Sequence, residues 1–88
     1  MKRLEITYIG RDHFNRELFL APKGTLNTLR DIYLVNLGDG RLFYVYIPAD
    51  GNPFYGEPDS LLGEGYEVVV TNEAERKARN EPPTASLT

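Results

Sequence analysis

The chain has 88 residues, of which 41% are hydrophobic and 26% charged, with no cysteine and a single histidine, His13. These proportions indicate a globular domain and exclude both a disulfide framework and a zinc site built from thiolates. The formal net charge of −3 disfavours nucleic acid as a partner, because phosphate backbones are bound mainly through lysine and arginine. A protein without cysteine suits a reducing compartment, so we expect a cytoplasmic location.

The N-terminal segment has basic residues but no uninterrupted apolar run, since Glu5, Thr7 and Gly10 break it. We therefore expect neither a signal peptide nor a membrane span. The composition and the positions of glycine and proline predict one β-rich domain over residues 1–72. A short polar helix and a disordered C-terminal tail are expected over residues 73–88.

The first strands are indicated by alternation of apolar and polar side chains. Residues 4–9 alternate with period two until Gly10, and residues 17–21 resume the extended pattern after a polar turn. These two strands are expected to form a hairpin. Residues 25–30 fit a helix, a strand or a loop, and a third strand is expected from about Arg30 to Leu37.

Asp39-Gly40 lies between two apolar runs and predicts a two-residue hairpin turn of type I′. Counting outward from that turn gives the facing pairs on one side of the sheet: Leu37 and Leu42, Val35 and Tyr44, Tyr33 and Tyr46. The pairs on the other side, which we expect to be the core, are Asn36 and Phe43, Leu34 and Val45, Ile32 and Ile47. The first side is rich in tyrosine and suits core rim, a subunit contact or a binding surface.

The segment of residues 50–59 is expected to be a surface loop because it is dense in Gly, Pro, Asn and Asp. Its adjacent aromatics, Phe54 and Tyr55, either pack under the loop or face a partner. The acids Asp50, Glu57 and Asp59 do not have the spacing of an EF-hand, and two prolines interrupt them. We interpret them as solvated loop residues and expect no metal and no cofactor.

Residues 66–70 predict a last strand, and residues 73–79 a short helix capped by Thr71 or Asn72. The fold class is therefore mainly β: a small antiparallel sheet of about five strands with a short C-terminal helix or tail. The sheet is either an open meander or a partly open barrel of the SH3-like kind.

Sequence motifs give no support to catalysis. Asp12 and His13 are neighbours in a turn, where adjacent side chains usually diverge, and no serine or cysteine nucleophile pattern accompanies them. The glycines form neither a dinucleotide-binding nor a P-loop motif. We expect that the protein is not an enzyme.

Three phrases of the chain carry a family resemblance: residues 8–12 with 14–16, residues 36–40, and residues 54–59. Together they resemble the short uncharacterised domains of gut Firmicutes and their mobile elements, of the kind catalogued as large polyvalent protein-associated domains. The resemblance implies a bacterial cytoplasm and a conjugative or phage-derived gene neighbourhood. It implies no activity and no catalytic residue.

The sequence thus favours a protein–protein interaction module that contacts a protein partner or a second copy of itself. Exposed aromatics are favoured anchors of such contacts. The alternatives are a small-barrel nucleic-acid-binding protein and an acidic phage-type inhibitor. The candidate partner-binding residues are Phe54, Tyr55, Glu57, Asp59, Tyr33, Tyr44 and Tyr46.

Overall fold

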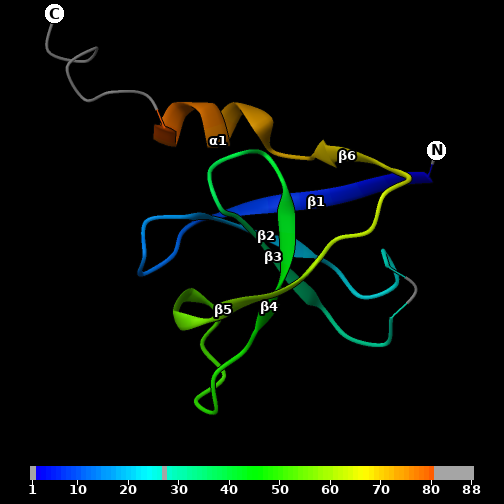
Figure 1. The fold of residues 1–88 in the computed structure, drawn as a ribbon. Coiled ribbons are helices and arrows are strands. Elements are labelled where there is room, and N and C mark those ends of the chain that lie inside the picture. Colours follow the sequence, from blue (N-terminus) through cyan, green and yellow to red (C-terminus); the bar gives the residue numbers. More distant parts are fainter. Residues whose placement is uncertain (1, 27, 81–88) are drawn as a thin grey trace, which may run out of the picture.

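The computed structural model describes residues 2–26 and 28–80, and it is mainly β (Figure 1). One helix, α1, and a single turn of 3₁₀ helix, η1, accompany the strands. The elements in chain order are β1 (Lys2–Arg11), β2 (Glu17–Ala21), β3 (Ile32–Asn36), β4 (Leu42–Tyr46), η1 (Pro53–Tyr55), β5 (Glu57–Leu61), β6 (Tyr66–Val70) and α1 (Glu73–Asn80). The expected fold class is confirmed, and the expected tail beyond Asn80 lies outside the described residues.

The strands form one six-stranded sheet in the order β5-β4-β3-β2-β1-β6. Consecutive strands from β1 to β5 are antiparallel, whereas β6 lies parallel to β1. The sheet has six strands rather than about five, and it is mixed rather than purely antiparallel. The parallel pair arises because the chain crosses from the β5 edge to the β1 edge and enters beside the start of β1.

The strand that sequence reasoning missed is β5. Its five residues contain Pro58 and two acids, which are depleted in strands, so the segment was expected to be part of the loop. It pairs with β4 through Phe43 opposite Leu61 and Tyr46 opposite Glu57, with an irregularity between them. Tertiary pairing at a sheet edge, where proline is tolerated, overrides the weak strand propensity.

The predicted register between β3 and β4 is wrong by one residue. Leu34 lies opposite Tyr44 and Val35 opposite Phe43. The connection has five residues instead of two, because the Asn36 side-chain oxygen accepts hydrogen bonds from the backbone N–H groups of Gly38 (2.8 Å) and Gly40 (3.1 Å). A one-residue shift exchanges the faces of a strand, so Tyr33 does not share a face with Tyr44 and Tyr46.

The core lies on the face of the sheet that carries Tyr8, Phe19 and Leu34, which stand in register across β1, β2 and β3. The rings of Tyr8 and Phe19 meet edge to face, with centroids 5.7 Å apart. The predicted tyrosine face therefore does not exist, since Tyr44 packs against this core. The buried residues of the cluster are Leu4, Ile6, Tyr8, Phe19, Ala21, Leu34 and Leu62.

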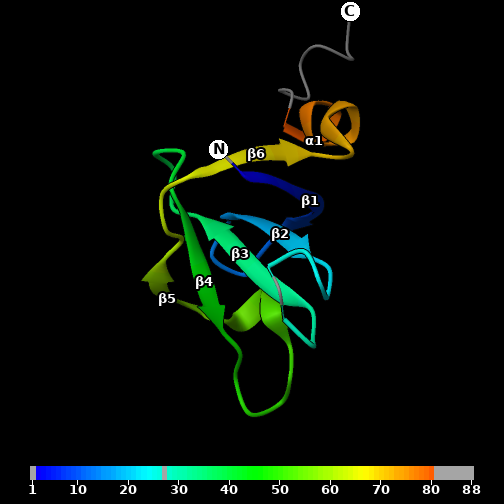
Figure 2. The same ribbon diagram turned by 90° about the vertical axis from the view of Figure 1, so that its right-hand side faces the viewer.

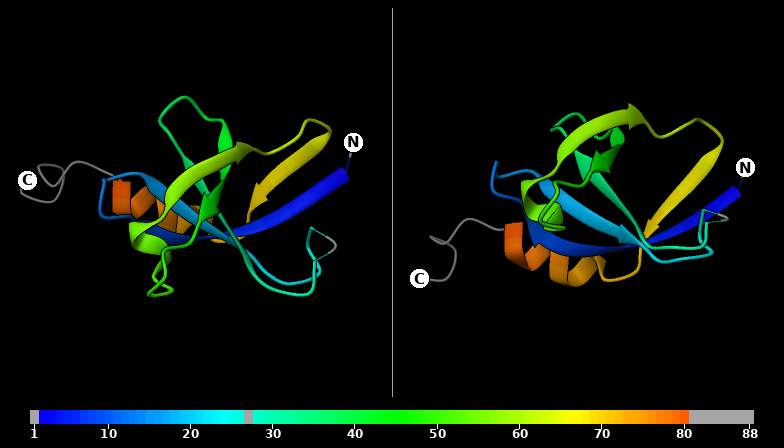
Figure 3. Two further views of the ribbon diagram at one scale, coloured as in Figure 1. Left: turned by 60° about the horizontal axis from the view of Figure 1, so that its bottom comes forward. Right: turned by 90° about the horizontal axis from the view of Figure 1, so that it is seen from below.

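The sheet is open but curved, and its two edges are consecutive in the chain (Figure 3). Residues 62–65 connect β5 to β6 across the open side. Within this connection Leu62 is buried, and its N–H donates to the C=O of Leu42 (2.8 Å). The residues left open in the sequence, 25–30, form turns and bends where they are described.

The helix α1 follows β6 and lies beside β1 (Figures 1 and 2). Asn72 lies between β6 and α1, and its side-chain amide pairs with the edge of β1. Its oxygen accepts from the N–H of Tyr8 (2.8 Å), and its nitrogen donates to the C=O of Tyr8 (2.9 Å). The amide thus replaces a neighbouring strand at the point where β6 ends.

Replacing Asn72 with alanine removes both bonds to Tyr8. We expect Asn72→Ala to lower the free energy of unfolding by about 2 kcal/mol, at about 1 kcal/mol per hydrogen bond. Urea denaturation measures the change. The control is Glu67→Ala on exposed β6, expected to stay within about 0.5 kcal/mol of the wild type. Equal stability of the two variants would refute the role given to Asn72.

Candidate functional site

The loop between β1 and β2 is organised around the carboxylate of Asp12, which is buried. One carboxylate oxygen accepts from the backbone N–H groups of Phe14 (2.9 Å) and Arg16 (2.8 Å). The other accepts from the guanidinium of Arg16, with Nε at 2.9 Å and Nη2 at 2.8 Å. Asn15, with a φ of 65°, completes the tight turn. This set of charge-assisted bonds fixes the loop in one conformation.

The same loop docks on η1, forty residues further along the chain. The N–H of His13 donates to the C=O of Phe54 (2.8 Å), and Nη2 of Arg16 donates to the C=O of Gly56 (3.1 Å). Gly56 is buried against β4, and a Cβ there would overlap the side chain of Val45. The 3₁₀ turn is held from its other end by Asn52, whose side chain accepts from the N–H of Phe54 (3.0 Å).

Docking brings together three rings that we call the aromatic patch: His13, Phe14 and Tyr55. The ring centroid of His13 lies 4.6 Å from that of Tyr55 and 5.3 Å from that of Phe14. Phe14 is 54% exposed and Tyr55 48% exposed, although both are large apolar side chains. The guanidinium of Arg16 stacks over Phe14 at 4.7 Å from the ring centroid. The patch is therefore exposed and rigidly supported.

The structure separates the two adjacent aromatics of the predicted loop. Phe54 is half-buried and its ring approaches Gly10, where a Cβ would lie 3.8 Å from Phe54 Cε2. Gly10 has a φ of 122°, which disfavours other residues at this position. Phe54 is thus a structural anchor, while Tyr55 contributes its face to the patch.

The other predicted site residues do not gather with Tyr55 into one site. Tyr33 and Tyr44 are half-buried on opposite faces of the sheet. Glu57 and Asp59 are exposed along the edge strand β5. Tyr46 is 67% exposed and pairs with Glu57.

The sequence analysis did not identify Phe14, Asp12 or His13 as residues of a functional site. The sequence places Phe14 in a polar turn and predicts that the side chains of Asp12 and His13 diverge, with no role in a site. The sequence does contain a signal for this loop. Asp12 stands four residues before Arg16, and Asn15 between them is suited to positive φ, a pattern typical of a tight turn closed by its own side chains. The docking partner, η1, could not be found from this local pattern.

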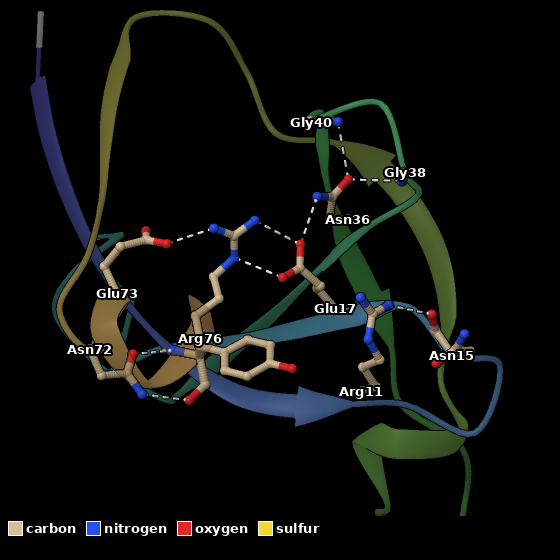
Figure 4. A network of polar contacts seen from close by, with 10 residues as sticks. Arg11, Asn15, Glu17, Asn36, Gly38, Gly40, Asn72, Glu73 and Arg76 are labelled. Carbon is tan, nitrogen blue, oxygen red and sulfur yellow. Dashed lines mark hydrogen bonds and ion pairs between the residues drawn. The ribbon is translucent and has the colours of Figure 1, made fainter. Parts of the chain in front are cut away.

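A second polar cluster joins α1 to the sheet (Figure 4). Arg76 donates to the buried carboxylate of Glu17 through Nε (2.7 Å) and Nη2 (3.0 Å), and to Glu73 through Nη1 (2.6 Å). Asn36 also donates to Glu17 (3.2 Å). The hydrogen bonds to Glu17 and Glu73 raise the pKa of Arg76 above its ordinary value. The bonds to Glu17 tie α1 to β2.

The acids of the predicted loop do not assemble into a ligand set. Asp50 accepts from the N–H of Asn52 (3.0 Å) as a turn residue does. Over residues 2–26 and 28–80, no group of three or more His, Cys, Asp or Glu side chains is placed to hold a metal ion. Within the same residues, no helix has the length and apolar character needed to cross a membrane.

Comparisons with known proteins give no relative of this chain: no protein-family model, no curated protein and no solved structure matches it.

Removing the Asp12 carboxylate should dismantle the patch. We expect Asp12→Ala to lower the free energy of unfolding by about 3–5 kcal/mol, because it leaves Arg16 without its buried counter-charge. The matched control is Asp39→Ala. Asp39 also accepts from a backbone N–H and pairs with an arginine, Arg41, but it is exposed, so its loss should cost much less.

Urea denaturation compares the two aspartate variants. Chemical shifts of the His13 and Tyr55 ring protons report separately on the patch, and they should move in Asp12→Ala and stay unchanged in Asp39→Ala. An Asp12→Ala protein with wild-type stability and wild-type ring shifts would contradict the assignment.

Proposed function

We propose that this protein is a non-enzymatic protein-interaction module and that the aromatic patch of His13, Phe14 and Tyr55 is its contact surface. The observation that carries the proposal is the exposure of three rings in contact with one another, on two loops that a buried ion pair holds together. Aromatic side chains on a fixed support bind with little loss of conformational entropy, which favours them as interface anchors.

Local charge supports a protein partner over nucleic acid. The cation closest to the rings, Arg16, is neutralised by Asp12 within the loop. The acids Glu57 and Asp59 extend from the same loop region along β5 and add negative charge. An aromatic surface with little net positive charge suits an apolar or mixed protein surface better than a phosphate backbone.

Catalysis is not part of the proposal. The buried acid nearest the patch, Asp12, is fully engaged in hydrogen bonds to Arg16 and Phe14, so it serves the loop rather than a substrate. The bacterial, mobile-element setting and the cytoplasmic location stay predictions from the sequence. The proposal includes self-association, in which the partner that binds the patch is a second copy of the chain.

A double substitution tests the patch. The Phe14→Ala, Tyr55→Ala protein should lose its specific partner in affinity purification from host lysate, and titration with the purified partner should show binding weakened about 30-fold, the equivalent of a 2 kcal/mol hot spot. Tyr46→Ala removes a tyrosine outside the patch that is more exposed than Tyr55, and it is the matched control. A folded double variant that still retains every partner of the wild type in affinity purification would contradict the proposal.

Nucleic acid is the second candidate, because Arg11 and Arg16 lie in the segment that carries the rings and could support stacked bases. We expect no retardation of single- or double-stranded oligonucleotides in gel shifts at about 50 mM salt, where affinity driven by counterion release is high. Retardation that Phe14→Ala, Tyr55→Ala abolishes would replace the protein partner with a nucleic acid.

A further inference from the structure

The edge strand β6 turns half of its backbone groups away from β1. The N–H of Lys2 donates to the C=O of Gly65, and the N–H of Thr71 donates to the C=O of Ile6, both at 2.8 Å. In a parallel pair, the residues that bond to the neighbour alternate along the strand with those that face outward. The residues of β6 whose N–H and C=O groups point outward are therefore Tyr66, Val68 and Val70.

These outward groups border a hollow on the open side of the sheet. The hollow has a volume of about 410 Å³ and is lined on the β6 side by Val68 and Val70. Its other side is formed by the end of β5 and the start of β4, with Leu42, Leu61 and Leu62. Val68 is 41% exposed although its side chain lies on the core face of β6. The sheet thus leaves apolar side chains and backbone polar groups side by side at this edge.

The two edges of the sheet differ in how well they would accept another strand. At the β5 edge, Pro58, two acids and an irregular register oppose pairing, as in many protected edges. The β6 edge has neither proline nor lysine, and its one charged residue is Glu67. A strand would therefore add at β6.

The short link between β5 and β6 limits the width of the open side at that end to a narrow segment, such as one strand of a partner. Residues 62–65 link Leu61 to Tyr66, so these ends are at most about 18 Å apart. One inserted strand needs about 4.8 Å on each side. A second copy is less suitable, because its own β6 is already part of a wide sheet.

One cation at the rim, Arg41, is open to an acidic residue of a bound segment. The hollow is lined by Arg41 and Arg76 against one carboxylate, Glu64. Arg76 is held by Glu17 and Glu73, but the pair of Arg41 with Asp39 is exposed, with Nε and Oδ2 2.7 Å apart. Exposed pairs of this kind contribute little, so Arg41 can exchange its partner for a carboxylate of a bound segment.

We propose that β6 binds an extended segment of a partner protein as an added strand, with apolar side chains at alternate positions filling the hollow and an acidic residue beside Arg41. Backbone hydrogen bonds to Tyr66, Val68 and Val70 supply the pairing, and the hollow selects the side chains. This surface is separate from the aromatic patch, so the proposal stands independently of the function assigned to the patch.

The probe is a fluorescein-labelled peptide, Glu-Val-Thr-Val-Thr-Val-Glu, with a lysine-ended analogue, both followed by fluorescence anisotropy on the full chain. We expect saturable binding of the acidic peptide and binding weakened about fivefold for the lysine peptide. Val68→Pro removes an outward N–H without breaking a bond to β1, and it should weaken binding about tenfold. Val68→Thr keeps the N–H and the shape, and it is the matched control.

If Val68→Pro fails to fold, the test uses N-methylated versions of the acidic peptide, whose binding to the wild-type protein is measured. In an added strand only alternate N–H groups bond to the neighbour, so methylating one alternate set should abolish binding and methylating the other should not. The Phe14→Ala, Tyr55→Ala protein should bind the peptide as the wild type does. Absence of saturable binding up to about 1 mM, or equal effects of the two methylation sets, would overturn the proposal.

Discussion

The buried carboxylate of Asp12 is the interaction on which the exposed end of this protein depends. A buried acid is stable only when its charge is paired and its oxygens accept hydrogen bonds, and the loop between β1 and β2 supplies both through Arg16 and its own backbone. Once the guanidinium is held there, its Nη2, which also pairs with Asp12, donates to the C=O of Gly56. One ion pair thereby fixes two loops and the rings that they carry.

A second constraint acts at the edge of β1, which is longer than its partner β6. The backbone of Tyr8 would otherwise lack a neighbour, and the Asn72 side-chain amide takes that place. Because the amide ends the ladder, the chain turns into α1 and brings Arg76 over the buried carboxylate of Glu17. The result is a sheet closed by polar side chains at one end and left open beside Val68 at the other.

The sequence predicted the β-rich class, the hairpin at Asp39-Gly40 and the helix after Asn72, because each has a local cause in periodicity, turn chemistry or charge order. It failed at the register of β3 and β4, where Asn36 binds two N–H groups of the turn and lengthens it. That bond depends on geometry within the folded loop. An error of one residue moved Tyr33 to the other face and removed the predicted tyrosine surface.

The sequence alone determined that the chain would turn repeatedly before β5, although the expected loop, residues 50–59, extends three residues into that strand. It left open whether Phe54 and Tyr55 pack under the loop or face a partner. Only the tertiary structure decided that Phe54 packs toward Gly10 while Tyr55 stacks on His13, and that Glu57–Leu61 is a strand. The physical reason is distance along the chain. The groups that select these outcomes belong to the β1–β2 loop and to β4, and their contacts exist only after the sheet has formed.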